Sequence, residues 1–142
     1  MATELTEAAV QSLLETAHAA RRRAYAPYSE FLVGAALLAR DGRVYVGCNI
    51  ENASFGGTVC AERVAIGTAV ADGVRDFLAI AVVGGPARTG TEEPCVPCGI
   101  CRQVLSEFCS PDFSVILEGR EGVSVHSLAS LLPSSFSMER KA

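Results

Sequence analysis

Residues 32–39 read LVGAALLA, an uninterrupted apolar run with the length of a buried strand. The dipeptide Asp41-Gly42 follows, and this pair favours a tight hairpin turn because glycine readily adopts a left-handed backbone. Beyond the turn, Val44-Tyr45-Val46 consists of residue types that favour strands. The sequence therefore predicts two adjacent antiparallel strands, and the other elements are expected to assemble around this hairpin.

Helical and strand patterns alternate along the rest of the chain. Apolar residues recur at helical spacing from Val10 to Ala17, which predicts an amphipathic helix over residues 5–23. We expect further helices over residues 60–71, 97–108 and 128–132, and further strands over residues 77–83, 113–117 and 123–125. This order predicts an α/β fold in which one mixed, five-stranded sheet carries helices on both faces. A chain of 142 residues is expected to form a single domain, residues 1–142.

The composition narrows the range of functions. The chain has 12 Lys and Arg residues against 16 Asp and Glu residues, a formal net charge of -4. Nucleic-acid-binding domains usually carry a basic excess, because contacts with phosphates supply much of their affinity. The basic run Arg21-Arg22-Arg23 is interpreted as the solvated last turn of the first helix, where cations suit the helix dipole. We therefore expect no nucleic acid polymer as a partner.

The N-terminal residues MATELTEAAV contain acidic groups and no apolar core, so we expect no signal peptide. No apolar run approaches the ~20 residues needed to cross a bilayer, so no membrane partner is expected either. These features predict a cytoplasmic protein, in which cysteines stay reduced. Six cysteines in that compartment indicate a metal site or reactive thiols rather than a disulfide framework.

Two cysteine-containing segments carry the predicted chemistry: CAER at residues 60–63 and PCGICRQ at residues 97–103. Together they supply three thiols, those of Cys60, Cys98 and Cys101. A closed structural zinc site prefers four ligands, whereas three protein ligands leave a fourth position at which zinc can acidify a water molecule. Glu62 lies beside one predicted ligand and is then placed to move protons. The pattern predicts a hydrolytic zinc enzyme with one Zn²⁺ per chain.

The spacing of these residues predicts their local geometry. Cys98 and Cys101 are three residues apart, so their sulfurs can share one face of a helical first turn. Cys60 and Glu62 are two residues apart and would point about 200° apart on a regular helix, so Cys60 is expected at the N-cap position. The guanidinium of Arg63 is expected to hydrogen-bond ligand sulfurs and to offset the negative charge of three thiolates.

Other interpretations of the cysteines are open at this point. Cys95 and Cys98 form a CxxC of their own, so a closed structural site with Cys60, Cys95, Cys98 and Cys101 is one alternative. A redox dithiol is another. The turn-rich, polar segment over residues 47–59 is expected to line a pocket, although an ordinary surface loop has the same composition.

The motifs resemble those of a known family. CAE at residues 60–62 with PCGIC at residues 97–101 is similar to the zinc deaminase signature, in the variant with three cysteines. CNIENA at residues 48–53 and YAPYSEFLVGAAL at residues 25–37 extend the resemblance to the small, homotetrameric cytidine deaminases. The resemblance runs to about Phe136 and implies a three-layer α/β/α sandwich.

The resemblance also implies roles for individual residues. The three cysteines would hold zinc, and Glu62 would shuttle protons. The implied substrate contacts are Phe31 in the nucleoside pocket, Asn49 and Glu51 at the ribose hydroxyls, the backbone of Ala61 at the pyrimidine edge, and Phe136, which would stack on the base from a neighbouring subunit. Two residues depart from the family pattern: Cys95 adds a thiol before the motif, and Phe55 replaces a frequent tyrosine.

A cytidine deaminase would hydrolyse cytidine and deoxycytidine to uridine and deoxyuridine with release of ammonia, a reaction of pyrimidine salvage. One alternative is a deaminase of a modified cytosine nucleoside, such as a blasticidin-type antibiotic, because that enzyme type shares the cysteine motifs. The alternative of a different class is a zinc-binding module without catalytic activity.

Overall fold

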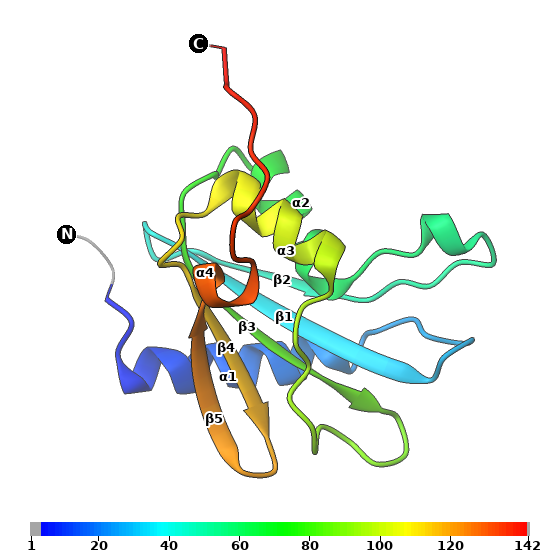
Figure 1. The fold of residues 1–142 in the computed structure, drawn as a ribbon. Helices are drawn as coiled ribbons and strands as arrows, with labels where there is room; N and C mark the ends of the chain where they lie inside the picture. Colours follow the sequence, from blue (N-terminus) through cyan, green and yellow to red (C-terminus); the bar gives the residue numbers. More distant parts are fainter. Residues whose placement is uncertain (1–3, 142) are drawn as a thin grey trace.

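A mixed sheet of five strands runs through the middle of the molecule (Figure 1). The computed structural model describes residues 4–141; residues 1–3, which begin the N-terminal segment quoted above, and residue 142 lie outside the described residues. The strands lie in the order β2-β1-β3-β4-β5. Their bounds are β1 Phe31–Ala39, β2 Val44–Cys48, β3 Phe77–Pro86, β4 Ser114–Gly119 and β5 Gly122–Ser127.

The predicted hairpin is confirmed as the antiparallel pair β1 and β2, in which Leu37 lies opposite Tyr45. Gly42 in its turn has φ 95°, a left-handed value that glycine adopts without a steric penalty. β1 also pairs antiparallel with β3, and β4 pairs antiparallel with β5. β3 and β4 are parallel, so a crossover must connect them, and α3 (Gly99–Phe108) lies in this connection.

Helices cover both faces of the sheet, as the sequence predicted. α1 (Glu7–Arg21) packs on one face, where Leu14 and Ala17 meet the even-numbered residues of β1. On the other face lie α2 (Ala61–Ala71), α3 and the short α4 (Leu128–Leu131) (Figure 1). Successive strand residues alternate between the two cores, which is the period of a strand buried on both sides. The three-layer α/β/α sandwich is thereby confirmed.

Helix boundaries differ from the predictions by one or two residues: the first helix also ends at Arg21 rather than at residue 23, and the last ends at Leu131 rather than at residue 132. The first helix begins at Glu7 rather than at residue 5, because the hydroxyl of Thr6 accepts a hydrogen bond from the backbone N–H of Ala9 (3.1 Å) and caps the helix. α3 begins at Gly99 rather than at Pro97, because Cys98 has extended backbone angles and occupies the N-cap. Within residues 4–141, no helix combines the length and apolar character that crossing a bilayer requires.

Gly47 seats α2 directly on β2. A Cβ atom at this position would lie 2.1 Å from the carbonyl oxygen of Ala61 and 2.6 Å from the backbone nitrogen of Ala65. Real Cβ atoms do not approach backbone atoms so closely, so only glycine allows the first turn of α2 to pack at this depth. The position of the α2 N-terminus, and of Cys60 in front of it, therefore depends on Gly47.

The substitution Gly47→Ala is expected to lower the free energy of unfolding by about 1–3 kcal/mol, because backbone atoms of α2 must move to admit the methyl group. Gly67→Ala, within α2, is the matched control: its Cβ would meet nothing within 4 Å, and alanine favours the helix by up to ~1 kcal/mol. Urea unfolding measures both. Equal stability of the Gly47→Ala variant and the original chain would contradict this account of the contact.

Candidate active site

Three thiols from two helix N-termini lie together. Cys60 is the N-cap residue of α2, as predicted from its spacing to Glu62, and Cys98 is the N-cap residue of α3. Cys101 follows in the first turn of α3. The sulfur atoms of these three cysteines all lie within 4.8 Å of one another.

The geometry of this cluster fits zinc. The sulfurs of Cys60 and Cys98 are 3.8 Å apart, and two sulfurs at about 2.3 Å from a tetrahedral zinc ion are separated by about 3.8 Å. Cys101 is buried and Cys98 is exposed, so the cluster opens to solvent on one side. Cys95 does not belong to the group, although it was part of the closed four-cysteine alternative. Three sulfurs with one open side match a site that keeps a position for chemistry.

Hydrogen bonds among the thiols shift their pKa values. Hydrogen bonds from the Cys101 thiol first, then from Arg63 and Cys98, outweigh burial and lower the pKa of Cys60 to about 5. The same pairing raises the pKa of Cys101, because its proton stabilises the Cys60 anion. Nη2 of Arg63 donates to the sulfur of Cys60 (3.6 Å). Arg63 thus lies where the sequence placed it, next to a ligand sulfur.

Glu62 stands out among the described residues as the one polar or charged residue classed as buried, with 4% of its surface exposed. Burial raises the pKa of its carboxyl group above the usual range for glutamate. The residue follows the N-cap by two positions and faces the same pocket as Cys60. The structure therefore brings a buried carboxyl group and the thiol cluster to one place, where a carboxyl group can exchange protons.

A pocket of about 250 Å³ adjoins the cluster. The residues that line it are Ser29, Phe31, Val33, Asn49, Glu51, Thr58, Val59, Cys60, Ala61, Glu62, Cys95, Val96 and Cys98. Four of the five predicted substrate contacts, Phe31, Asn49, Glu51 and Ala61, are in this set. Two cysteines of the cluster, Cys60 and Cys98, also contribute to the wall. The predicted pocket function of the 47–59 segment agrees with this lining.

The fifth predicted contact, Phe136, does not line the pocket of its own chain. It lies on the C-terminal segment after α4, with 69% of its surface exposed, and its carbonyl oxygen accepts a hydrogen bond from Nε2 of Gln103 (3.1 Å). Figure 1 shows this segment extending away from the sheet. The placement of Phe136 in a neighbouring subunit's pocket stays a prediction.

Several pocket residues were absent from the predicted contacts: Ser29, Val33, Thr58, Val59, Cys95 and Val96. Ser29 and Val33 lie inside the segment 25–37 that carried the resemblance, but nothing in their residue types signals a pocket.

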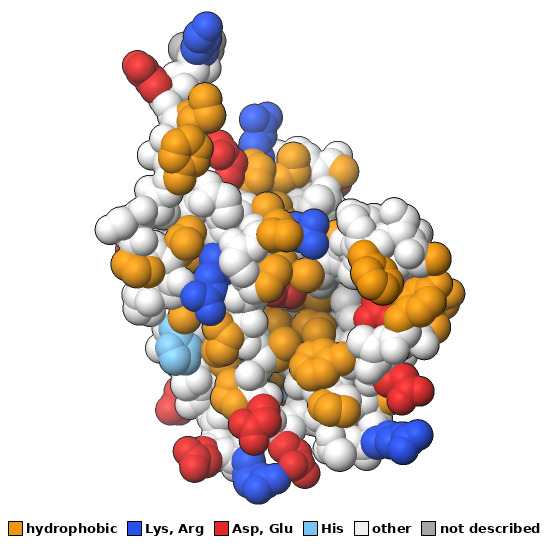
Figure 2. All heavy atoms as spheres, turned by 45° about the vertical axis from the view of Figure 1, so that its right-hand side comes forward, with side chains coloured by type: hydrophobic (Ala, Val, Ile, Leu, Met, Phe, Trp, Pro, Cys, Tyr) orange, Lys and Arg blue, Asp and Glu red, His pale blue; other side chains and the backbone are white. Residues whose placement is uncertain are grey.

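Figure 2 shows hydrophobic side chains gathered around a hollow on the face that includes η1 (Phe55–Gly57). An apolar rim of this kind can bind a planar ring of a ligand, or it can be buried against another protein surface.

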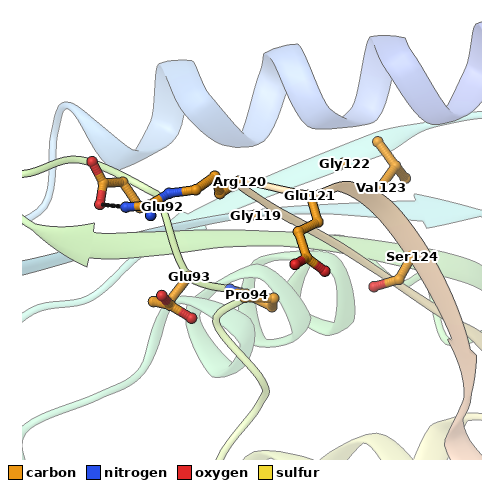
Figure 3. Close-up of a pocket in the computed structure, with 9 residues that line it drawn as sticks. All are labelled: Glu92, Glu93, Pro94, Gly119, Arg120, Glu121, Gly122, Val123 and Ser124. Carbon is orange, nitrogen blue, oxygen red and sulfur yellow. Dashed lines mark hydrogen bonds and ion pairs between the residues drawn. The ribbon is translucent and has the colours of Figure 1, made fainter.

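A second cavity, of about 480 Å³, lies between the β4–β5 hairpin and residues 92–94. Figure 3 shows Arg120 turned toward Glu92, with which it forms an exposed ion pair. Glu93 and Glu121 add further acidic groups. The lining of this cavity shares no residue with the pocket beside the thiol cluster and includes no cysteine. The cavity therefore takes no part in the zinc site.

An α/β/α sandwich with three clustered thiols and a buried carboxyl group at helix N-termini defines a zinc-dependent hydrolytic enzyme. Residues 8–117 match the family model described as the cytidine and deoxycytidylate deaminase zinc-binding region. This chain belongs to that family.

Individual relatives agree with this membership. The chain is 50% identical over 131 residues to a cytidine deaminase of Sporosarcina psychrophila, covering 92% of this chain and 93% of that protein. The crystal structure of cytidine deaminase from Burkholderia pseudomallei has a TM-score of 0.81 at 48% identity and covers 93% of this chain and all of that one (100%). A blasticidin-S deaminase of Bacillus cereus is 34% identical over 104 residues, 71% of this chain and 74% of that protein.

We expect Cys98→Ala to lose most of the bound zinc while the fold is retained, because Cys98 is an exposed member of the three-thiol group. Cys95→Ala is the matched control, since Cys95 lies three residues away in the same segment but outside the group. Metal analysis of the purified proteins should give about one zinc per chain for the control and well below half of that for Cys98→Ala. Equal zinc loss in both variants would contradict the three-cysteine assignment.

Proposed function

We propose that this chain catalyses the hydrolytic deamination of cytidine and deoxycytidine to uridine and deoxyuridine, with release of ammonia. The observation that carries the proposal is the buried carboxyl group of Glu62, which shares one pocket with Cys60 and Cys98. A binding module has no need of a buried carboxyl group in such a position, because burying one costs free energy. The buried carboxyl group of Glu62 is therefore better explained as a proton carrier in catalysis.

The proposed mechanism divides the work between the cluster and Glu62. Cys60, Cys98 and Cys101 would hold the zinc ion, which supplies Lewis acidity that activates water near neutral pH. Glu62 accepts the proton that water loses as its oxygen bonds to C4 of the cytosine ring. It delivers this proton to N3, then takes the proton of the hydroxyl group now on C4 and passes it to the amine as the C4–N4 bond breaks. Water and cytidine thus give uridine and ammonia, and Glu62 is left unchanged.

The remaining pocket residues are proposed to hold the nucleoside. Phe31, 39% exposed, offers an aromatic face to the substrate. Asn49 and Glu51 provide an amide and a carboxylate for the ribose hydroxyls. The backbone of Ala61, the first residue of α2, is proposed to read the pyrimidine edge. Arg63 is proposed to offset the charge of the thiolates through its bond to Cys60.

We further propose that residues 1–142 act as one domain in a homotetramer, in which Phe136 stacks on the base bound by a neighbouring subunit. The proposal is supported by the exposure of Phe136 and of large apolar residues near the pocket, such as Val96, 45% exposed, and Ile100, 62% exposed. Exposed apolar surface of this kind is typical of faces that become buried in protein–protein interfaces. We also propose that the chain acts in pyrimidine salvage in the cytoplasm.

A modified cytosine nucleoside is the second candidate substrate, favoured by the similarity to a blasticidin-S deaminase. Competition kinetics between cytidine and blasticidin S separate the two. A clear preference for blasticidin S in kcat/KM would replace cytidine as the substrate without changing the reaction.

Glu62→Gln is expected to retain zinc and fold, because the amide has nearly the same shape, and to lower kcat for cytidine by at least about a hundredfold, because it cannot carry a proton. The loss of cytosine absorbance and the release of ammonia measure turnover. Arg75→Gln, at an exposed arginine outside the pocket, is the control and should keep full activity. A Glu62→Gln variant with near-normal turnover would rule out the proposed proton carrier.

The pocket is expected to prefer nucleosides to nucleotides. None of its described lining residues is Lys or Arg, and Glu51 and Glu62 add acidic groups to the lining. A phosphate group would therefore lack a counter-charge, and kcat/KM for cytidine 5′-monophosphate should be at least about tenfold below that for cytidine. The same absorbance assay tests both substrates. Equal use of the two would show that a cation reaches the 5′ position from outside this lining.

A further inference from the structure

We propose that Ser29 is a positioning residue of the nucleoside pocket: its hydroxyl ties the carboxylate of Glu51 to the backbone of Phe31 and so holds the aromatic ring in the pocket wall. All three residues line the pocket. The inference rests on the proposed function in one respect, namely that the pocket binds a cytosine nucleoside.

Glu51 is engaged by the turn that precedes β1. Its Oε1 accepts hydrogen bonds from the backbone N–H groups of Tyr28 (3.0 Å) and Ser29 (3.1 Å), and its Oε2 accepts one from the Ser29 hydroxyl. A carboxylate offers about four acceptor positions. Three of them therefore bind this turn, and one is left for a substrate hydroxyl. The Ser29 hydroxyl is also the main cause that lowers the pKa of Glu51, which keeps the carboxylate ionised.

The hydroxyl of Ser29 joins two partners at once. It donates its single proton to Glu51, and its oxygen accepts the backbone N–H of Phe31 (3.0 Å). The carbonyl oxygen of Phe31 accepts a hydrogen bond from Nδ2 of Asn49 (2.8 Å). Both backbone polar groups of Phe31 are thus held by side chains of the pocket. The residues proposed to bind ribose, Asn49 and Glu51, therefore also support the aromatic residue, and Ser29 is the link on the Glu51 side.

The backbone between Ser29 and Phe31 needs this support. Glu30 has φ 58°, a left-handed value that residues with a Cβ atom rarely adopt. Its N–H donates to the carbonyl of Ala26 (3.0 Å), and its carbonyl accepts from the N–H of Ala87 (2.8 Å). Without the Ser29 hydroxyl, the turn loses two hydrogen bonds, the one to Glu51 and the one from the N–H of Phe31. The backbone of Phe31 is then free to shift away from the pocket.

The test compares Ser29→Ala with Ser29→Thr, which keeps a hydroxyl, and with Ser12→Ala, at an exposed serine on α1. The readouts are kcat and KM for cytidine and the affinity for 2′,3′-dideoxycytidine as a competing ligand. Ser29→Ala should raise both KM and the dideoxycytidine dissociation constant by about tenfold, with a smaller change in kcat. Ser29→Thr should stay within about threefold of the original chain, and Ser12→Ala should be unchanged.

Two results would overturn the inference. One is a Ser29→Ala variant within twofold of the original chain for both ligands. The other is a loss seen with cytidine but absent with dideoxycytidine, because that pattern indicates direct contact with the ribose hydroxyls rather than positioning of Phe31.

A second readout does not depend on turnover. The chain contains no tryptophan, so Phe31→Trp introduces a single fluorescent reporter. Adding Ser29→Ala should make the tryptophan at position 31 more accessible to acrylamide, whereas adding Ser12→Ala should not. Unchanged quenching would refute the positioning role. Absence of cytidine turnover by the zinc-loaded original chain would refute the proposed function alone, since the quenching experiment still decides the role of Ser29.

Discussion

The contact between the backbone of β2 and the first turn of α2 is the constraint on which the site depends. Gly47 leaves no space for a side chain between Ala61 and the strand. Because Cys60 caps α2, this contact determines where the first thiol lies. The other two thiols arrive from α3, which belongs to the crossover between the parallel strands β3 and β4. Sheet topology thus brings segments separated by nearly forty residues to one place.

Charge balance explains why such a cluster can exist at all. A buried carboxyl group and three ionised thiols would repel one another strongly without compensation. The Arg63 guanidinium at Cys60, the positive ends of two helices and a bound dication together offset these charges. Burial and the negative charge of Cys60 raise the pKa of Glu62, whereas the positive charge of Arg63 lowers it. The features that make the site costly to fold without metal are therefore the features that suit it to zinc.

Local patterns in the sequence predicted most of the fold. The hairpin and the N-cap position of Cys60 followed from turn chemistry and from helical geometry, and both are confirmed. The start of α3 was wrong by two residues, because Pro97 is compatible with a helix start and only the extended backbone of Cys98 excludes it. The links around Ser29 could not be predicted, since they join residues up to 23 positions apart through side-chain orientation. The pocket walls likewise depend on which residues the sheet brings together.

Three protein sulfurs are expected to hold the zinc ion, with one position left for the reaction. X-ray absorption spectroscopy at the zinc edge tests it most directly, because the scattering of sulfur differs from that of oxygen and nitrogen. We predict three sulfur neighbours at about 2.3 Å and one lighter neighbour at about 2.0 Å. Four sulfur neighbours would contradict it, since Cys95 or another thiol would then close the site and leave no position for chemistry.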